Sequence, residues 1–193
     1  MLNKYLLVLM VVGLFTFAAC QSNAAPKEAP TDTAPVEEAQ AAPTTSAKTA
    51  DYPFEIVTSF DQLAPIFNRD SDSTYVINFW ATWCKPCVEE LPYFEQLHDD
   101  FSGEKLKVIL VSLDFAKDID RKLVPFVEEH KLRSEVIALL DGQYNNWIDK
   151  VDPEWSGAIP VTVLYNAKER KFIGEQFSGY DELSGLVTDL LKT

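Results

Sequence analysis

Apolar positions between residues 52 and 193 follow two patterns, short continuous runs and longer runs with helical spacing. Continuous apolar runs are typical of buried strands, and recurrence every three or four residues is typical of the buried face of a helix. We expect strands at residues 55–57, 75–80, 106–113, 136–140, 161–165 and 171–176. We expect helices at residues 59–68, from about residue 84 onward, and at 118–131, 143–150 and 181–191.

Strands and helices alternate over most of this region, which predicts parallel strands joined by helical crossovers. The last two expected strands, 161–165 and 171–176, are separated only by a short turn, so they should pair antiparallel. The pattern therefore predicts a mixed sheet in an α/β domain.

The first 19 residues have the character of a targeting segment. Lys4 precedes a short apolar run at residues 6–17, which falls short of the ~20 residues of a membrane span and is typical of a signal peptide. The sequence FAAC at residues 17–20 resembles a bacterial lipobox. We therefore expect a lipoprotein signal peptide over residues 1–19 and a lipid on Cys20, which would also remove an unpaired exported thiol. The alternative is a plain secretory signal with an incidental cysteine.

Residues 20–51 are rich in Ala, Pro, Thr and Glu and almost free of large apolar side chains. Such a segment cannot bury enough surface to offset its ordering entropy, which predicts a flexible linker between the lipid and a domain at residues 52–193. Gln21 is not the Asp that often retains lipoproteins in the inner membrane. We expect a protein anchored in the bacterial cell envelope and facing the periplasm, with the outer membrane favoured.

The formal net charge of −13 argues against nucleic-acid binding, because phosphate contacts need clustered Lys and Arg. Acidity is more simply interpreted as a source of solubility. We expect a monomer.

The most informative chemistry is the sequence WCKPC at residues 83–87, which follows an expected buried strand and begins an expected helix. Two thiols at this spacing can form and reopen a disulfide, and a strand–turn–helix context favours redox chemistry. A permanent disulfide is a weaker interpretation, because it would close almost no loop. A zinc site would need further ligands beyond His98 and His130, and a c-type haem site would need His where Val88 stands. We expect no metal and no bound cofactor.

Three segments carry a resemblance to the thioredoxin superfamily, and within it to exported TlpA/ResA-like proteins. They are FWATWCKPC at residues 79–87, ELP at 90–92 and IPVT at 159–162. The resemblance implies a three-layer α/β/α sandwich with a mixed central sheet and the cysteines at a helix N-terminus. It also implies that part of residues 114–150 is an insertion into the minimal fold.

The cysteines have distinct expected roles. A helix N-terminus favours the reactive thiolate, so Cys84 is the expected nucleophile and Cys87 the resolving thiol of a redox disulfide Cys84–Cys87. Lys85 either favours that thiolate or is an ordinary surface charge. The resemblance implies a cis peptide bond before Pro160, which would leave the backbone of Ile159 free to pair with a bound peptide.

Glu90 is a candidate proton acceptor for Cys87, since it matches a glutamate that similar proteins place near the cysteines. The alternative is an acid favoured by the helix dipole. Asn78 stands where ordinary thioredoxins carry a buried aspartate, and an amide cannot accept that proton.

The four tryptophans divide between core and surface. Trp83 is expected on the rim of the substrate site and Trp80 in the core. Trp147 and Trp155 are expected to pack the middle segment, with an approach of Trp155 to the site as the alternative.

These features predict a membrane-anchored thiol–disulfide oxidoreductase that reduces disulfides of exported proteins, including cytochrome c maturation clients, and receives electrons from a transmembrane thiol donor. Two alternatives stay open. One is a disulfide oxidase or isomerase on the same fold, and the other is a non-catalytic copper-handling or client-binding module.

Overall fold

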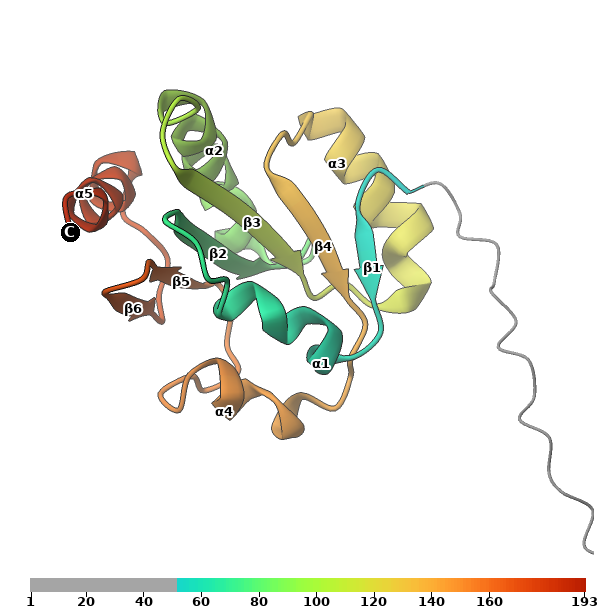
Figure 1. The fold of residues 1–193 in the computed structure, drawn as a ribbon. Helices are drawn as coiled ribbons and strands as arrows, with labels where there is room; N and C mark the ends of the chain where they lie inside the picture. The colour runs from blue at the N-terminus through green and yellow to red at the C-terminus, as the bar shows by residue number, and fades with distance from the viewer. Residues whose placement is uncertain (1–51) are drawn as a thin grey trace, which may run out of the picture. The chain divides into compact units, whose positions relative to one another are not determined.

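The computed structural model describes residues 52–193, so the predicted signal peptide, the lipid on Cys20 and the linker lie outside the described residues. These residues form a six-stranded mixed sheet in the order β1-β4-β3-β2-β5-β6 with helices on both faces (Figure 1). This arrangement is the predicted α/β/α sandwich. Within residues 52–193, none of the helices is long and apolar enough to cross a bilayer.

Strand β2 (Thr74–Trp80) is the centre of the sheet, and all of its residues are buried. It pairs in parallel with β3 (Leu106–Ser112) and antiparallel with β5 (Val161–Tyr165). A continuous apolar run is expected of a strand that is covered on both faces. The antiparallel edge is completed by β6 (Arg170–Ile173), as the short turn between the last two strands predicts.

Alternation along β2 divides the core into two halves. Val76 and Trp80 face helices α2 (Lys85–Asp100), α3 (Val124–His130) and α5 (Tyr180–Leu191). Ile77 and Phe79 face α1 (Phe60–Leu63) and α4 (Ile148–Val151). Figure 1 shows the two helical layers on opposite sides of the sheet. Asn78, which lies between Ile77 and Phe79, is therefore directed toward the α2 side.

The segment between β3 and β5 adds a strand to the sheet. Strand β4 (Glu135–Leu139) pairs in parallel with β3 on one side and with β1 (Glu55–Val57) on the other, so it separates the two. The chain enters β4 from α3 and leaves it through a loop that carries α4. Trp147 and Trp155 in that loop are buried and pack near Phe79, as predicted.

Three predicted helices are shorter or less regular than expected. The helix predicted at 59–68 is α1 followed by a 3-10 helix at Ala64–Phe67. The helix at 118–131 begins with a π-helical turn at Ile119–Leu123 before α3. Pro65 and Pro125 cause these breaks, since proline has no N–H to donate to a helical carbonyl.

The segment predicted as a helix at 143–150 contains only a 3-10 turn at Tyr144–Asn146 and the short α4. Trp147 interrupts the two pieces with a non-helical φ of −137°, and its side chain is buried against Phe60. Burial of one large side chain has outweighed local helix propensity here.

Candidate functional site

The two cysteines lie where β2 ends and α2 begins. Cys84 is the N-cap residue of α2, and it forms a disulfide with Cys87 in the first turn, with a Cα–Cα distance of 5.3 Å. Cys84 is 6% exposed and Cys87 is fully buried. A reagent or a client protein can therefore approach the pair only at Cys84.

The backbone at this helix N-terminus favours negative charge on Cys84. The N–H of Cys87 donates a hydrogen bond to the Sγ atom of Cys84 at 3.3 Å. Unpaired N–H groups and the helix dipole stabilise an anion at this position. The Nζ atom of Lys85 instead lies 3.5 Å from the carboxylate of Glu89, and the Lys85 side chain is almost fully exposed. Lys85 is therefore an ordinary surface charge, and the helix N-terminus acts on the sulfur directly.

The peptide bond between Ile159 and Pro160 is cis, and it faces the cysteines. The carbonyl oxygen of Ile159 lies 3.7 Å from the Sγ atom of Cys84. Trp83, which precedes the first cysteine, is 50% exposed and lies on the rim of the site. The structure therefore brings Trp83, Ile159 and Pro160 to the cysteines, as the sequence predicts, whereas Trp80 is in the core.

Glu90 is buried one helical turn beyond Cys87, so the two side chains lie on neighbouring positions of α2. Its Oε1 atom accepts a hydrogen bond from Nδ2 of Asn78 at 2.9 Å, and its Oε2 atom accepts one from the N–H of Phe177 at 3.0 Å. The Nδ2 atom of Asn78 also donates to Oγ1 of Thr162 in β5 at 3.0 Å. Asn78 therefore links the carboxylate to the strand that follows the cis-proline.

Burial raises the pKa of Glu90 to about 7, while the hydrogen bonds from Phe177 and Asn78 act in the opposite direction. Desolvation penalises the charged form of a carboxyl group, and two donors only partly compensate. Glu90 can therefore take up or release a proton near neutral pH. The alternative, an acid present because the helix dipole favours it, does not account for this burial.

Sequence reasoning missed Asp114, which is buried at the end of β3. Its carboxylate accepts hydrogen bonds from the N–H and the hydroxyl of Thr82 at 3.0 and 2.5 Å, and from the hydroxyl of Ser112 at 2.9 Å. Thr82 lies in the turn that leads to Cys84, so Asp114 positions that turn. An acid directly after a buried strand was the available signal, since polar groups at the end of neighbouring parallel strands meet at one sheet edge.

Sequence reasoning also missed the loop after β6. The side-chain amide of Gln176 donates to the carbonyl oxygen of Pro86 at 3.1 Å, and the adjacent Phe177 binds Glu90. The expected strand 171–176 ends at Ile173, which frees this loop to contact the first turn of α2. These contacts join residues about 90 positions apart, and no local pattern signals them.

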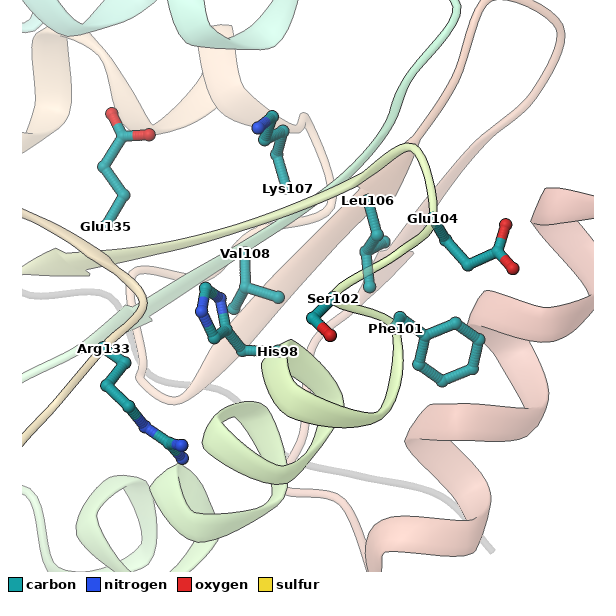
Figure 2. A pocket seen from close by; sticks show the side chains of 9 residues that line it. All are labelled: His98, Phe101, Ser102, Glu104, Leu106, Lys107, Val108, Arg133 and Glu135. Carbon is teal, nitrogen blue, oxygen red and sulfur yellow. The ribbon is translucent and has the colours of Figure 1, made fainter.

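A pocket of about 360 Å³ lies near the end of α2 that is farther from the cysteines (Figure 2). His98 lines it, roughly 20 Å along the helix from the cysteines at 1.5 Å per residue. Arg133, which lines the pocket together with Lys107, forms ion pairs with Glu95 and Asp99. The pocket is therefore separate from the thiols.

Neither histidine is placed as a metal ligand. His130 is exposed and stacks on Phe126 with ring centroids 4.0 Å apart. Across residues 52–193, no three His, Cys, Asp or Glu side chains come together in a way that could hold a metal ion.

Comparison with known proteins agrees with this geometry. The AhpC/TSA family matches residues 39–170 of the chain. The thiol-disulfide oxidoreductase ResA of Oceanobacillus iheyensis is 30% identical over 118 residues, which cover 60% of this chain and 56% of ResA. The sporulation thiol-disulfide oxidoreductase A of Bacillus subtilis is 27% identical over 93 residues, covering 48% of this chain and 53% of that protein. The chain thus spans about half the length of these curated relatives.

Solved structures show the same fold at lower identity. A secreted thiol-disulfide isomerase from Corynebacterium glutamicum superposes with a TM-score of 0.52 at 17% identity, over 64% of this chain and 73% of that one. A thioredoxin-related protein from Neisseria meningitidis serogroup B gives a TM-score of 0.50 at 22% identity, over 63% and 84%. These similarities establish a thioredoxin-like fold.

The burial of Glu90 predicts a specific pH dependence of stability. The carboxyl group binds its proton more tightly when folded, so its contribution to the free energy of unfolding is complete below pH 4.5 and is lost as the pH rises to about 7. The loss is on the order of 3 kcal/mol, because each pKa unit between 4.5 and about 7 corresponds to about 1.4 kcal/mol. We expect Glu90→Gln to remove this loss, so that the variant gains stability relative to the parent protein between pH 5 and pH 8.

Urea unfolding of the oxidised parent protein and of Glu90→Gln, at pH 5 and at pH 8, measures this difference in the free energy of unfolding. Glu89→Gln is the matched control, because Glu89 is half exposed on the same helix turn. Equal pH dependence in the parent protein and in Glu90→Gln would show that Glu90 titrates as an ordinary acid.

Proposed function

We propose that this chain, which belongs to the AhpC/TSA family, is a thiol–disulfide oxidoreductase that acts on disulfides of exported proteins. The observation that carries the proposal is the asymmetric cysteine pair, in which only Cys84 is accessible and its sulfur lies at both a helix N-terminus and the Ile159–Pro160 bond. The names of the curated relatives support the same activity.

In the first step, the thiolate of Cys84 attacks one sulfur of the client disulfide. A bond forms between Cys84 and that sulfur, the client S–S bond breaks, and the other client sulfur leaves as a thiolate that takes a proton from water. Backbone N–H groups at the start of α2 stabilise the attacking thiolate. The backbone of Ile159, whose carbonyl oxygen lies 3.7 Å from the Sγ atom of Cys84, is proposed to pair with the client strand that carries the cysteine.

In the second step, Cys87 gives its proton to Glu90 and attacks the Sγ atom of Cys84. The Cys84–Cys87 disulfide forms, the mixed disulfide breaks, and the second client sulfur is released as a thiolate that takes a proton from water. The client has then gained two electrons and two protons, and the protein is in the oxidised state that the structure shows. A general base is most effective when its pKa lies near the working pH, as that of Glu90 does.

The proposed direction is reduction, with electrons returned to Cys84–Cys87 by a transmembrane thiol donor. This direction rests on the resemblance to TlpA/ResA-like proteins, since the relatives' names specify oxidoreductases without a direction. We place the protein outside the cytoplasm, attached to the membrane through a lipid on Cys20. Clients of the cytochrome c maturation type are one proposed class.

A copper-handling module is not favoured, because the relatives' names describe redox proteins and no third ligand lies beside the cysteines in residues 52–193. An oxidase or isomerase would use the same residues with a different equilibrium between the dithiol and the disulfide.

Cys87→Ser tests the covalent intermediate. The variant keeps the nucleophile but cannot resolve the mixed disulfide, so we expect client proteins to accumulate on Cys84, visible by mass spectrometry after capture from the cell envelope. Cys84→Ser is the control and should capture none. If no adduct forms and the purified parent protein fails to reduce a test disulfide, the proposed activity is wrong.

An equilibrium redox titration tests the direction. A reductant is expected to have a potential of about −270 mV, whereas a value of about −120 mV is typical of a strong oxidant. A measured value at the oxidising end would replace the proposed reductase with an oxidase.

Glu90→Gln tests the proton acceptor. We expect the rate of client release from the mixed disulfide to show an inflection near pH 7 in the parent protein and in Glu89→Gln, but not in Glu90→Gln. The measurement is stopped-flow exchange with a peptide disulfide between pH 5 and 9. An unchanged profile in Glu90→Gln would remove this residue from the mechanism.

A further inference from the structure

The turn between β2 and α2 sets where the sulfur of Cys84 lies. It spans residues 81–84 and contains a backbone hydrogen bond in which the N–H of Cys84 donates to the carbonyl oxygen of Ala81 at 3.1 Å. That bond joins the two ends of the turn and does not involve Thr82 or Trp83, which lie between them. The position of the turn relative to the sheet therefore depends on other contacts.

A side chain that follows the neighbouring strand supplies such contacts. Asp114, just beyond the end of β3, accepts hydrogen bonds from both donors of Thr82, one on each carboxylate oxygen. The N–H of Thr82 donates to Oδ2 at 3.0 Å, and the hydroxyl of Thr82 donates to Oδ1 at 2.5 Å. A carboxylate that binds two donors of one residue fixes the orientation of that residue as well as its distance.

Asp114 is itself fixed to the sheet. The hydroxyl of Ser112 donates to Oδ2 of Asp114 at 2.9 Å, and the N–H of Asp114 donates to the same hydroxyl oxygen at 3.1 Å. Ser112 is the register partner of Trp80 in the β2–β3 pair, and the N–H of Leu113 donates to the carbonyl oxygen of Trp80 at 2.8 Å. The carboxylate therefore holds Thr82 against the paired ends of two central strands.

Packing alone does not explain an acid at position 114. Asp114 is 2% exposed, and the three groups that donate to its carboxylate are uncharged. None of the ion pairs within residues 52–193 includes Asp114. Burial of a carboxylate without a cationic partner is costly, and such costs are typical of residues that a functional site requires.

We propose that Asp114 is a positioning residue for Cys84, which keeps the sulfur at the N-terminus of α2 after the disulfide opens. In the oxidised protein the bond to Cys87 fixes this sulfur. Reduction removes that bond, and the position of the sulfur then depends on the Cys84 backbone, which the contacts between Asp114 and Thr82 hold in place. The inference rests on the proposed function and adds a residue to the same site.

The charge of Asp114 by itself would have the opposite effect on Cys84. A negative charge nearby disfavours a thiolate, whereas a sulfur held at a helix N-terminus has its thiolate stabilised. If Asp114 acts through position, its loss makes Cys84 less reactive. If Asp114 acts only through its charge, its loss makes Cys84 more reactive. The sign of the change in reactivity therefore distinguishes the two.

The test measures the rate at which iodoacetamide alkylates Cys84 in the reduced protein between pH 5 and pH 9, with peptide mass spectrometry to separate Cys84 from the other thiols. At pH 7 we expect Asp114→Asn to react about tenfold more slowly than the parent protein, and Thr82→Val, which loses only the hydroxyl, about threefold more slowly. In both variants the pH profile of alkylation should move to higher pH. Thr82→Ser retains the hydroxyl and should react at the parent rate.

Ser112→Ala is the matched control, because it removes a hydrogen bond to the same carboxylate and leaves both bonds from Thr82 in place. This variant should unfold at a lower urea concentration, while Cys84 is alkylated at the parent rate.

Faster alkylation in Asp114→Asn would overturn the positioning role, as would unchanged rates in Asp114→Asn and Thr82→Val or an equal slowing in Ser112→Ala. If Asp114→Asn does not fold, the comparison of Thr82→Val with Thr82→Ser decides the question, because equal rates in these two variants would overturn the positioning role. A parent protein that fails to reduce a peptide disulfide would refute the proposed function and would leave the alkylation result unaffected.

Discussion

The first turn of helix α2 leaves backbone N–H groups without helical carbonyl partners, and the sulfur of Cys84 lies where they point. The rest of the site depends on this junction. Strand β2 is buried on both faces and fixes where the chain leaves the sheet, and Asp114 holds Thr82 in the turn that follows. The Cys84 thiolate that the N-terminus of α2 stabilises is thereby held in a fixed position.

Behind the junction, a polar chain crosses an otherwise apolar core. Glu90, Asn78 and Thr162 connect α2, β2 and β5 through side-chain hydrogen bonds. The Oδ1 atom of Asn78 has no hydrogen-bond partner within residues 52–193, so the chain is not fully satisfied. A buried acid and an incompletely paired amide both cost stability. Such costs are typical of sites where chemistry, not packing, decides which residue is present.

The sequence predicted the central strands and the long helices well, because continuous apolar runs and helical spacing reflect burial directly. It failed where one residue opposed the local pattern. Pro65 and Pro125 interrupted predicted helices, and burial of Trp147 broke another. Within the site, motifs identified the cysteines, Glu90 and Pro160. Phe177, which binds Glu90, and Asp114, which binds Thr82, are remote in sequence from these partners, and only the fold brings them together.

The unequal burial of the two sulfurs limits how many molecules can be joined to the protein at once. Because Cys87 has no exposed surface, a second client cannot form a bond to it while the first occupies Cys84. The pair therefore has two reactive sulfur atoms but can hold only one client protein covalently at a time. Each encounter ends either in closure of the internal disulfide or in return of the same client. The dithiol cannot become a bridge between two exported proteins.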